Sequence, residues 1–536
     1  MATRFSILII FLIGAYFLLG YHLYELQLVK GGYYLAQADS EAAAAQGASG
    51  SRGSIYFTDK DGNLLPAAIE QDSPLIYAVP SSIVNAQAAA DAVAPIINLS
   101  PTALDAVFSR AGDSYEPLKV KADAGTAQQI TNLDLKGIYS EMVPERYYPL
   151  STVASQVLGY VGPNSSGNGT SGHYGIESFY NTPLAAGTDV DLTIDPNIQI
   201  EAEKVLDTLV SANGATGGSV IIEDPQTGKI LAMGATPSFD PNNYSASPIA
   251  SFLNPMVQEV YEPGSIFKVL TMAAGIDAGK ITSSTTYDDL GYVNVDGAHI
   301  TNYNLTTYGA YGPDTTMTKV IEHSINTGAI FAENQTGNAI FTEYAKKFGL
   351  GQLTGIDVPG EVSGNLSQLN PKSPQVDFDT AAYGQGVAVT PIELVTAVAA
   401  IANGGVMMRP YLNAALSPEP LDRAISASTA AEVTEMMTNA VDDVAGAPAI
   451  KGYSIAGKTG SAYVPNPSGG GYLNELDDSY IGFGPTPDPK FIVFIRLNTL
   501  SVNSLAVDSV VPGFKTLAQY IINYYNIPPD RPTAGQ

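Results

Sequence analysis

The sequence predicts an α/β protein in three parts: an N-terminal transmembrane helix, an irregular α+β domain, and a larger domain whose helices flank a mainly antiparallel sheet. Three observations lead to this fold class. An apolar run lies near the N-terminus, short strand-like runs mix with a helical stretch up to residue 188, and amphipathic helices alternate with strands beyond it. With 536 residues, 45% of them hydrophobic and 14% charged, the chain can fill more than one domain core. We expect an anchor at residues 1–30, a first domain at 31–188, a second at 189–526 and a flexible tail at 527–536.

The apolar run at residues 5–23 predicts the transmembrane helix, because at about 1.5 Å per residue it is roughly 28 Å long. A cleavable signal peptide is the competing interpretation, but its apolar region is usually shorter and ends at a small-residue cleavage site. Here the bulky segment at residues 24–28 follows the run, so we expect an uncleaved anchor. Arg4 is the only charged side chain before the run, which favours a cytoplasmic N-terminus and an extracytoplasmic chain beyond residue 23.

Residues 31–188 show short, mixed patterns that predict an α+β domain. Strand-like runs lie at residues 74–79 and 118–120, and an alanine-rich run at 85–93 is typical of a helix. A loop rich in glycine, serine and asparagine occupies residues 162–172.

The second domain is predicted to begin with a strand at residues 190–194 and a helix that starts at Asp195 and Pro196. A carboxylate caps the first turn of a helix, and proline is tolerated there. An apolar face then recurs at helical spacing until Gly214 ends the helix. A hairpin, three later strands and a final helix follow, at residues 219–223 with 229–233, 453–464, 479–484, 491–497 and 514–525.

Composition excludes several classes of function. The formal charge of −27, with only 25 lysine and arginine residues, argues against nucleic acid as a partner. The chain has no cysteine, which excludes disulfides, thiol nucleophiles and thiolate metal sites. Its four histidines, His22, His173, His299 and His323, are scattered along the sequence, so we expect no histidine-rich metal site.

The strongest candidate for chemistry is the segment Glu-Pro-Gly-Ser-Ile-Phe-Lys at residues 262–268. Proline and glycine break the preceding segment, and the residues after Ser265 form a helix that is apolar nearly all round and therefore buried. Ser265 and Lys268 are three residues apart, so their side chains meet on one face. A serine at a helix N-terminus gains from the helix dipole as an alkoxide, and a buried lysine has a depressed pKa and can act as a base. By itself, a Ser-x-x-Lys pattern arises by chance in a chain of this length.

Two further motifs strengthen this candidate. Ser324 and Asn326 supply a hydroxyl and an amide two residues apart, although a polar turn or helix cap would look the same. Lys458 stands in an Ala-Gly-Lys-Thr-Gly-Ser-Ala strand, where the glycines allow a substrate backbone to pair with the strand edge. Thr459 and Ser461 face the same side of that strand.

Ser-x-x-Lys, Ser-x-Asn and Lys-Thr-Gly in this order are the signature of penicillin-binding proteins and serine β-lactamases. The chain resembles class B penicillin-binding proteins in particular, over almost its whole length. The resemblance rests on the Tyr-Glu-Pro-Gly-Ser form of the first motif and on further segments: Arg52-Gly53-Ser54-Ile55, Asp61-Gly62, Arg146-Tyr147-Tyr148-Pro149, Gly175-Ile176-Glu177, Gly355 to Glu361, Tyr383-Gly384-Gln385-Gly386, Thr390-Pro391 and Ala402-Asn403-Gly404-Gly405.

The resemblance implies a pedestal or dimerisation-type first domain and a β-lactamase-like transpeptidase second domain. It implies Ser265 as acylated nucleophile, Lys268 as its base and Lys458 as electrostatic support. Ser324 and Asn326 would line the cleft, with Ser324 helping to protonate the leaving amine. The substrate-binding residues would be Thr459, Gly460 and Ser461, of which Thr459 and Ser461 hold the terminal carboxylate of the donor peptide, and the oxyanion hole would be the N–H groups of Ser265 and Ser461. Position 461 more often holds threonine in the family.

The implied function is peptidoglycan D,D-transpeptidation in septal or lateral wall synthesis. Stem peptides are the substrates, β-lactams acylate the same serine, and a membrane glycosyltransferase is the expected partner. The resemblance implies no metal and no organic cofactor. The Tyr-Glu-Pro-Gly-Ser form favours the division-type branch. Alternatives are a D,D-carboxypeptidase, which differs only in accepting water, a β-lactamase, which needs no pedestal, and an inactive wall-synthesis scaffold. A Ser-His-Asp hydrolase is disfavoured, because no histidine accompanies a nucleophile elbow.

Overall fold

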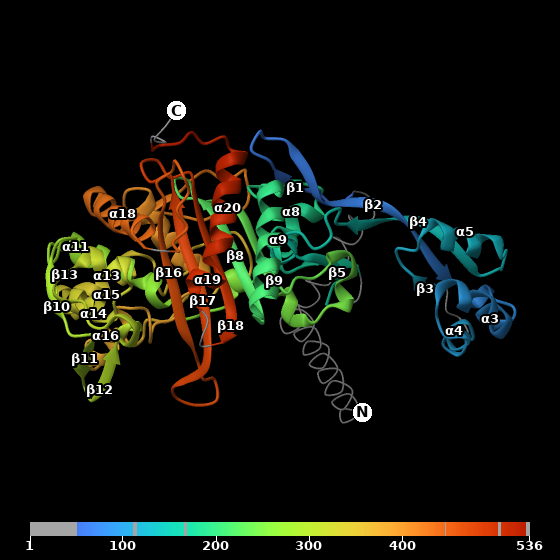
Figure 1. Ribbon diagram of the computed structural model, residues 1–536. Coiled ribbons are helices and arrows are strands. Elements are labelled where there is room, and N and C mark those ends of the chain that lie inside the picture. The colour runs from blue at the N-terminus through green and yellow to red at the C-terminus, as the bar shows by residue number, and fades with distance from the viewer. Residues whose placement is uncertain (1–50, 111–114, 166–168, 445, 502–504, 532–536) are drawn as a thin grey trace, which may run out of the picture.

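The computed structural model describes residues 51–110, 115–165, 169–444, 446–501 and 505–531. The predicted anchor at residues 1–30 lies outside these ranges, as do residues 532–536 of the predicted tail. Within the described ranges, no helix combines the length and the apolar character needed to cross a membrane. Figure 1 shows an elongated molecule in which long strands join a small lobe to a larger body.

A five-stranded sheet, here called the first sheet, joins the small lobe to the body. Its order is β3-β2-β1-β7, and β4 pairs with β2. The strand β2 pairs with β1 up to Ala68 and with β4 from Ile69 onward, so a single 15-residue strand reaches from the body into the lobe. The strands are β1 (Ile55–Thr58), β2 (Leu64–Ala78), β3 (Glu116–Lys119), β4 (Ile138–Tyr147) and β7 (Val190–Leu192).

Three helices and the far part of the first sheet form the small lobe, which has a core of its own. They are α3 (Ala86–Ile97), α4 (Pro101–Phe108) and α5 (Ala124–Asn132). The side chain of Asn85 accepts a hydrogen bond from the N–H of Ala88 and so caps α3. The strand-like runs at 74–79 and 118–120 overlap β2 and β3, and the run at 85–93 overlaps α3, so these local predictions are confirmed.

A buried ion cluster ties the first sheet to the segment that leads into the body. That segment contains α6 (Ser155–Leu158), β5 (Tyr160–Pro163), β6 (Thr170–His173), α7 (Gly175–Phe179) and α8 (Asn181–Ala185). Glu177 of α7 is fully buried and lies 2.7 Å from Arg52 and 2.6 Å from Arg146. The Tyr148 hydroxyl donates to the same carboxylate at 3.2 Å. Segments more than 120 residues apart therefore meet at one carboxylate.

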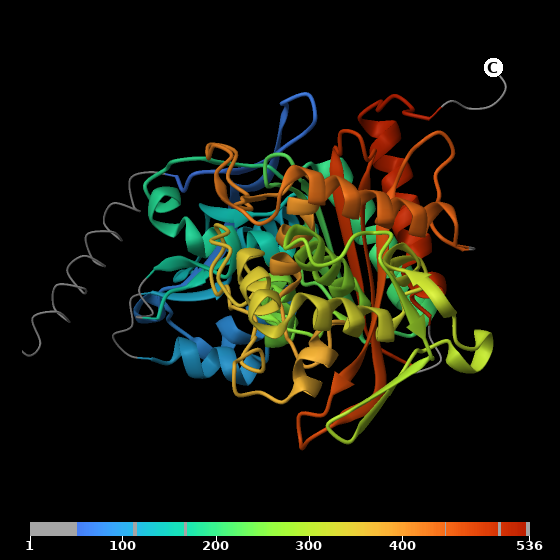
Figure 2. The same cartoon turned by 90° about the vertical axis from the view of Figure 1, so that its left-hand side faces the viewer.

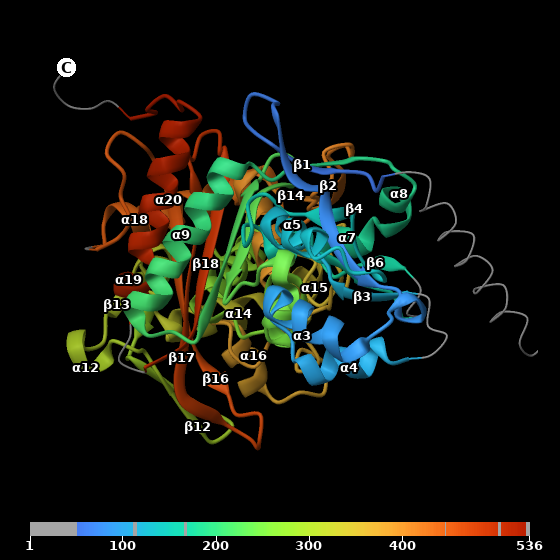
Figure 3. The ribbon, with the colours of Figure 1, turned by 90° about the vertical axis from the view of Figure 1, so that its right-hand side faces the viewer.

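The second sheet is antiparallel throughout and forms the centre of the body. Its order is β16-β17-β18-β8-β9. The strands are β8 (Gly217–Asp224), β9 (Lys229–Thr236), β16 (Ala456–Pro465), β17 (Tyr472–Gly484) and β18 (Phe491–Ser501). The helices α9 (Pro196–Asn213) and α20 (Val511–Tyr524) cover one face (Figure 3).

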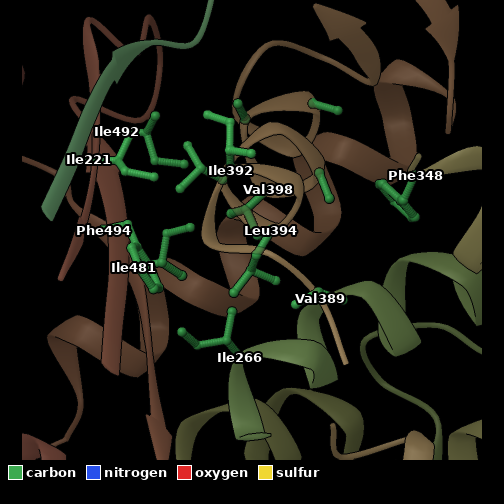
Figure 4. Packing of buried hydrophobic residues seen from close by; sticks show 14 of the residues in the cluster. Ile221, Ile266, Phe348, Val389, Ile392, Leu394, Val398, Ile481, Ile492 and Phe494 are labelled. Carbon is green, nitrogen blue, oxygen red and sulfur yellow. The ribbon is translucent and has the colours of Figure 1, made fainter. Parts of the chain in front are cut away.

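A layer of helices covers the other face of the second sheet (Figure 2). Figure 4 shows Ile221, Ile481, Ile492 and Phe494 of the sheet against residues of α17 (Pro391–Ala402), which is buried along its whole length. The other helices that matter for the site are α11 (Phe267–Asp277), α13 (Met317–Glu322), α14 (Asn326–Thr336), α15 (Asn338–Lys347), α16 (Gln375–Ala381), α18 (Ala427–Asp442) and α19 (Ala506–Ser509). Short strand pairs, β10 (Thr286–Asp289) with β13 (Gly312–Thr316) and β11 (Tyr292–Val295) with β12 (Ala298–Thr301), flank this layer.

Local sequence signals predicted α9, the β8–β9 hairpin, three late strands and the last helix, and the structure confirms them. Asp195 accepts hydrogen bonds from the N–H groups of Asn197 and Ile198, and Gly214 ends α9 in the left-handed conformation. The strand β17 begins at Tyr472, earlier than the expected residue 479. The first residues of β17 pair with β16 but are mostly exposed. They therefore need not be apolar, and the sequence shows no apolar strand pattern there.

The strand expected to open the second domain belongs to the first sheet. β7 ends at Leu192 and pairs in parallel with β1, with Val190 opposite Ile55. The architecture is a mixed α/β fold, as expected, but this strand links its two parts, and a boundary at residues 188 and 189 stays a prediction.

Candidate active site

Ser265 stands in a single 3-10 turn, Gly264–Ile266, that leads directly into α11. Gly264 has φ +55°, and a Cβ there would lie 2.6 Å from the carbonyl oxygen of Ser461. Only glycine therefore lets β16 pass this close to the turn. From Phe267 to Gly275 every residue of α11 is buried, as the apolar pattern predicted, whereas Ser265 stays half-exposed.

Lys268 lies one turn further along, and its side chain is fully buried. Its Nζ donates to Ser265 Oγ at 3.0 Å, to Ser324 Oγ at 3.2 Å and to Asn326 Oδ1 at 2.7 Å. The Ser324 carbonyl oxygen accepts from the same Nζ at 2.6 Å. Burial, and secondarily the charge of Lys458, holds the pKa of Lys268 well below its ordinary value. A neutral amine at this distance can take the hydroxyl proton of Ser265.

Ser324 and Asn326 meet Lys268 because the chain turns sharply between α13 and α14. Ser324 has φ +55°, a left-handed conformation that costs free energy for a side chain other than glycine. Asn326 is the first residue of α14, and its Nδ2 donates to the carbonyl oxygen of Thr301 at 3.1 Å. The turn thus directs the carbonyl and hydroxyl of Ser324 and the amide oxygen of Asn326 at one nitrogen.

Lys458 of β16 is a second lysine that reaches Ser324. It is 3% exposed, and its Nζ donates to Ser324 Oγ at 2.9 Å and to Thr459 Oγ1 at 3.3 Å. Burial lowers the pKa of Lys458 to about 7. Two buried lysines therefore share one serine hydroxyl, and in the described part of the chain neither Nζ forms a hydrogen bond or ion pair with a carboxylate.

A cleft of about 260 Å³ opens in front of these groups. Five of the predicted residues line it: Ser265, Ser324, Asn326, Thr459 and Ser461. Lys268 and Lys458 lie buried behind the cleft, and Gly460 lies between Thr459 and Ser461. A Cβ on Gly460 would lie 2.9 Å from the carbonyl oxygen of Pro263, which explains a glycine there. All eight site residues predicted from the sequence therefore lie in or directly behind this cleft.

Other side chains at this cleft had no role assigned from the sequence. Tyr383 and Gln385 line it; they belong to a segment that carried the resemblance. Asp478 of β17 was missed altogether, yet its Oδ1 accepts a hydrogen bond from Ser461 Oγ at 2.6 Å. In the described part of the chain, no group of three or more histidine, cysteine, aspartate or glutamate residues is arranged to bind a metal ion.

Comparison with known protein families matches two consecutive segments. Residues 218–509 match the penicillin binding protein transpeptidase domain, and residues 48–191 match the penicillin-binding protein dimerisation domain.

Similar curated proteins and solved structures span nearly the same length. The stage V sporulation protein D of Bacillus subtilis is 31% identical over 82% of this chain and 73% of its own. The peptidoglycan D,D-transpeptidase FtsI of Escherichia coli K12 is 27% identical over 98% of this chain and 92% of its own. The crystal structure of penicillin binding protein 2X from Streptococcus thermophilus shares the fold, with a TM-score of 0.70 at 20% identity over 89% of this chain and 80% of the other.

Proposed function

The chain belongs to the class B penicillin-binding proteins, and from this premise we propose that it cross-links peptidoglycan stem peptides as a serine D,D-transpeptidase with Ser265 as nucleophile. The observation that carries the assignment is the 3.0 Å hydrogen bond between Lys268 Nζ and Ser265 Oγ, made by a fully buried lysine with a depressed pKa. Such a pair is an activated nucleophile with its base.

Acylation begins when Ser265 Oγ attacks the carbonyl carbon of the penultimate D-alanine of a donor stem peptide. Lys268 Nζ takes the hydroxyl proton as the O–C bond forms, and the N–H groups of Ser265 and Ser461 stabilise the oxyanion. The C–N bond then breaks, and the leaving D-alanine amine receives a proton through Ser324, whose Oγ lies 3.2 Å from Lys268 Nζ. An amine of a second stem peptide then attacks the ester carbonyl carbon of the acyl-enzyme. The new C–N bond forms as the C–O bond to Ser265 breaks, and the proton lost by the amine returns through Lys268 to Ser265 Oγ.

The second lysine supports this cycle electrostatically. A cationic Lys458 next to Ser324 favours the neutral form of Lys268 and attracts the terminal carboxylate of the donor. Thr459, Gly460 and Ser461 form the edge of the second sheet, so the donor peptide can extend along β16. β-Lactams would acylate Ser265 by the same route.

The proposal also includes where the enzyme is located and which partner it has, and both depend on residues outside the described ranges. The apolar run at residues 5–23 supports a single-pass anchor, with the catalytic domain outside the cytoplasmic membrane. A membrane glycosyltransferase that polymerises the glycan strands is the expected partner, reached through the anchor and the first domain. The Tyr-Glu-Pro-Gly-Ser motif favours a role in division.

The test is intact-mass spectrometry of the detergent-solubilised full chain after incubation with benzylpenicillin, with the Ser265→Ala variant as its matched control. A stable adduct of one penicillin per chain, absent from the variant, is the expected result. Absence of an adduct on folded wild-type protein would favour an inactive scaffold. Rapid loss of the adduct with penicillin hydrolysis would favour a β-lactamase instead.

A further inference from the structure

A buried carboxylate lies directly behind Ser461. Asp478 of β17 stands opposite Ser461 in the register of the two strands and is fully buried. Ser461 Oγ donates to its Oδ1 at 2.6 Å, and Ser509 Oγ of α19 donates to its Oδ2 at 2.7 Å. Ser509 is 1% exposed, whereas Ser461 faces the cleft. An ionised carboxylate only accepts hydrogen bonds, so the hydroxyl proton of Ser461 points into the protein.

Thr459, two residues earlier on the same strand, has the opposite environment. Its Oγ1 accepts a hydrogen bond from Lys458 Nζ at 3.3 Å, so its own hydroxyl proton remains for a group in the cleft. Thr459 therefore presents a donor with a cation behind it, and Ser461 presents lone pairs with a carboxylate behind them.

We propose that Asp478 is a positioning residue that makes Ser461 accept a peptide N–H of the stem peptide, so that Thr459 alone of the two hydroxyls donates to the terminal carboxylate of the donor. This inference rests on the proposed function and refines the shared carboxylate role that the family resemblance implies for both residues. A carboxylate placed at Ser461 would meet lone pairs and the charge of Asp478, whereas an N–H would gain a hydrogen bond there.

The chain offers a closely matched control in the neighbouring residue. Asp477 precedes Asp478, but its carboxylate pairs with Arg496 at 2.6 Å instead of contacting Ser461. Asp477→Asn and Asp478→Asn therefore make the same chemical change one residue apart, and only the second alters the polarity of Ser461.

The experiment compares acylation of the full-length chain by benzylpenicillin and by its methyl ester, which lacks the free carboxylate. The readout is the ratio of the two second-order rate constants. In Asp478→Asn the Ser461 hydroxyl is free to turn toward the cleft, so the ratio should rise about tenfold in favour of benzylpenicillin, as expected for one hydrogen bond to a charged group. Asp477→Asn should leave the ratio unchanged.

Ser461→Ala supplies a second test, which keeps the Asp478 carboxylate and removes only the hydroxyl that donates to it. The ratio should stay within about twofold of the wild-type value, because the lost hydroxyl did not donate to the carboxylate. A fall of about tenfold in Ser461→Ala, or an unchanged ratio in folded Asp478→Asn, would overturn the inference while leaving the proposed function intact. If neither compound acylates the wild-type chain, the proposed function fails and the inference fails with it.

Discussion

Replacing Lys458 by methionine should make acylation slower at mildly acidic pH by raising the pKa of Lys268. The Nζ atoms of Lys268 and Lys458 lie 3.2 and 2.9 Å from Ser324 Oγ, so they are at most about 6 Å apart. Two unit charges at that separation interact by about 2.8 kcal/mol at an effective dielectric constant of roughly 20. Removing the charge of Lys458 favours protonated Lys268 by that amount, which corresponds to about a hundredfold loss of the reactive neutral form.

The assay is the second-order rate constant of acylation by a fluorescent penicillin between pH 5 and 9. Burial lowers the pKa of Lys458 to about 7, so its charge is present below that pH and lost above it. The wild-type rate constant should therefore fall toward low pH, as Lys268 becomes protonated, and fall again above about pH 7, as Lys458 loses its charge. In Lys458→Met the fall toward low pH, here called the acid limb, should begin at a higher pH, and the fall near pH 7 should be absent. Lys490→Met, which removes an exposed lysine paired with Asp488, should reproduce the wild-type profile. An acid limb that stays in place in Lys458→Met would refute the coupling of the two lysines.

Three further substitutions test the fold and the site. Glu177→Gln leaves Arg146 buried without its charged partner, so the free energy of unfolding should fall by about 3–5 kcal/mol in urea denaturation; a loss below about 1 kcal/mol would contradict this. Burial raises the pKa of Glu223 from 4.5 to about 8, so the wild type should lose stability as pH rises from 4.5 to 8 while the carboxyl ionises. Glu223→Gln should therefore raise Tm at pH 9 but not at pH 4.5. An equal gain at both pH values would show that ionisation of Glu223 is not the cause. Gly264→Ala puts a methyl group 2.6 Å from the Ser461 carbonyl oxygen, so penicillin labelling on gels should fall at least about tenfold, and unchanged labelling would argue against the tight turn.

Local patterns predicted those parts of the molecule whose cause is local. The cap at Asp195, the end of α9 at Gly214 and the buried face of α11 follow from residues a few positions apart. The pairing of Ser265 with Lys268 follows in the same way from their spacing on a helical turn. These interactions need no knowledge of the tertiary structure.

The rest of the site depends on contacts between distant segments. Ser324 and Lys458 are 134 residues apart and meet at 2.9 Å, a contact that motif order and family resemblance suggested but that spacing alone could not. Asp478 had no signal, because an aspartate in a polar stretch of sequence is normally exposed. Only the register with β16 shows that it is buried behind Ser461. The placement of β7 in the first sheet likewise depends on pairing with a strand about 135 residues earlier.

The most direct test of the central claim is the fate of a stem pentapeptide ending in D-Ala-D-Ala, incubated with the full chain and an isotope-labelled amine acceptor peptide. Liquid chromatography with mass spectrometry would identify the products. The account predicts release of D-alanine and a cross-linked product that carries the label, with both absent from Ser265→Ala. Release of D-alanine with only unlabelled tetrapeptide would show a carboxypeptidase, and an unchanged pentapeptide with folded protein would contradict the acyl-transfer mechanism altogether.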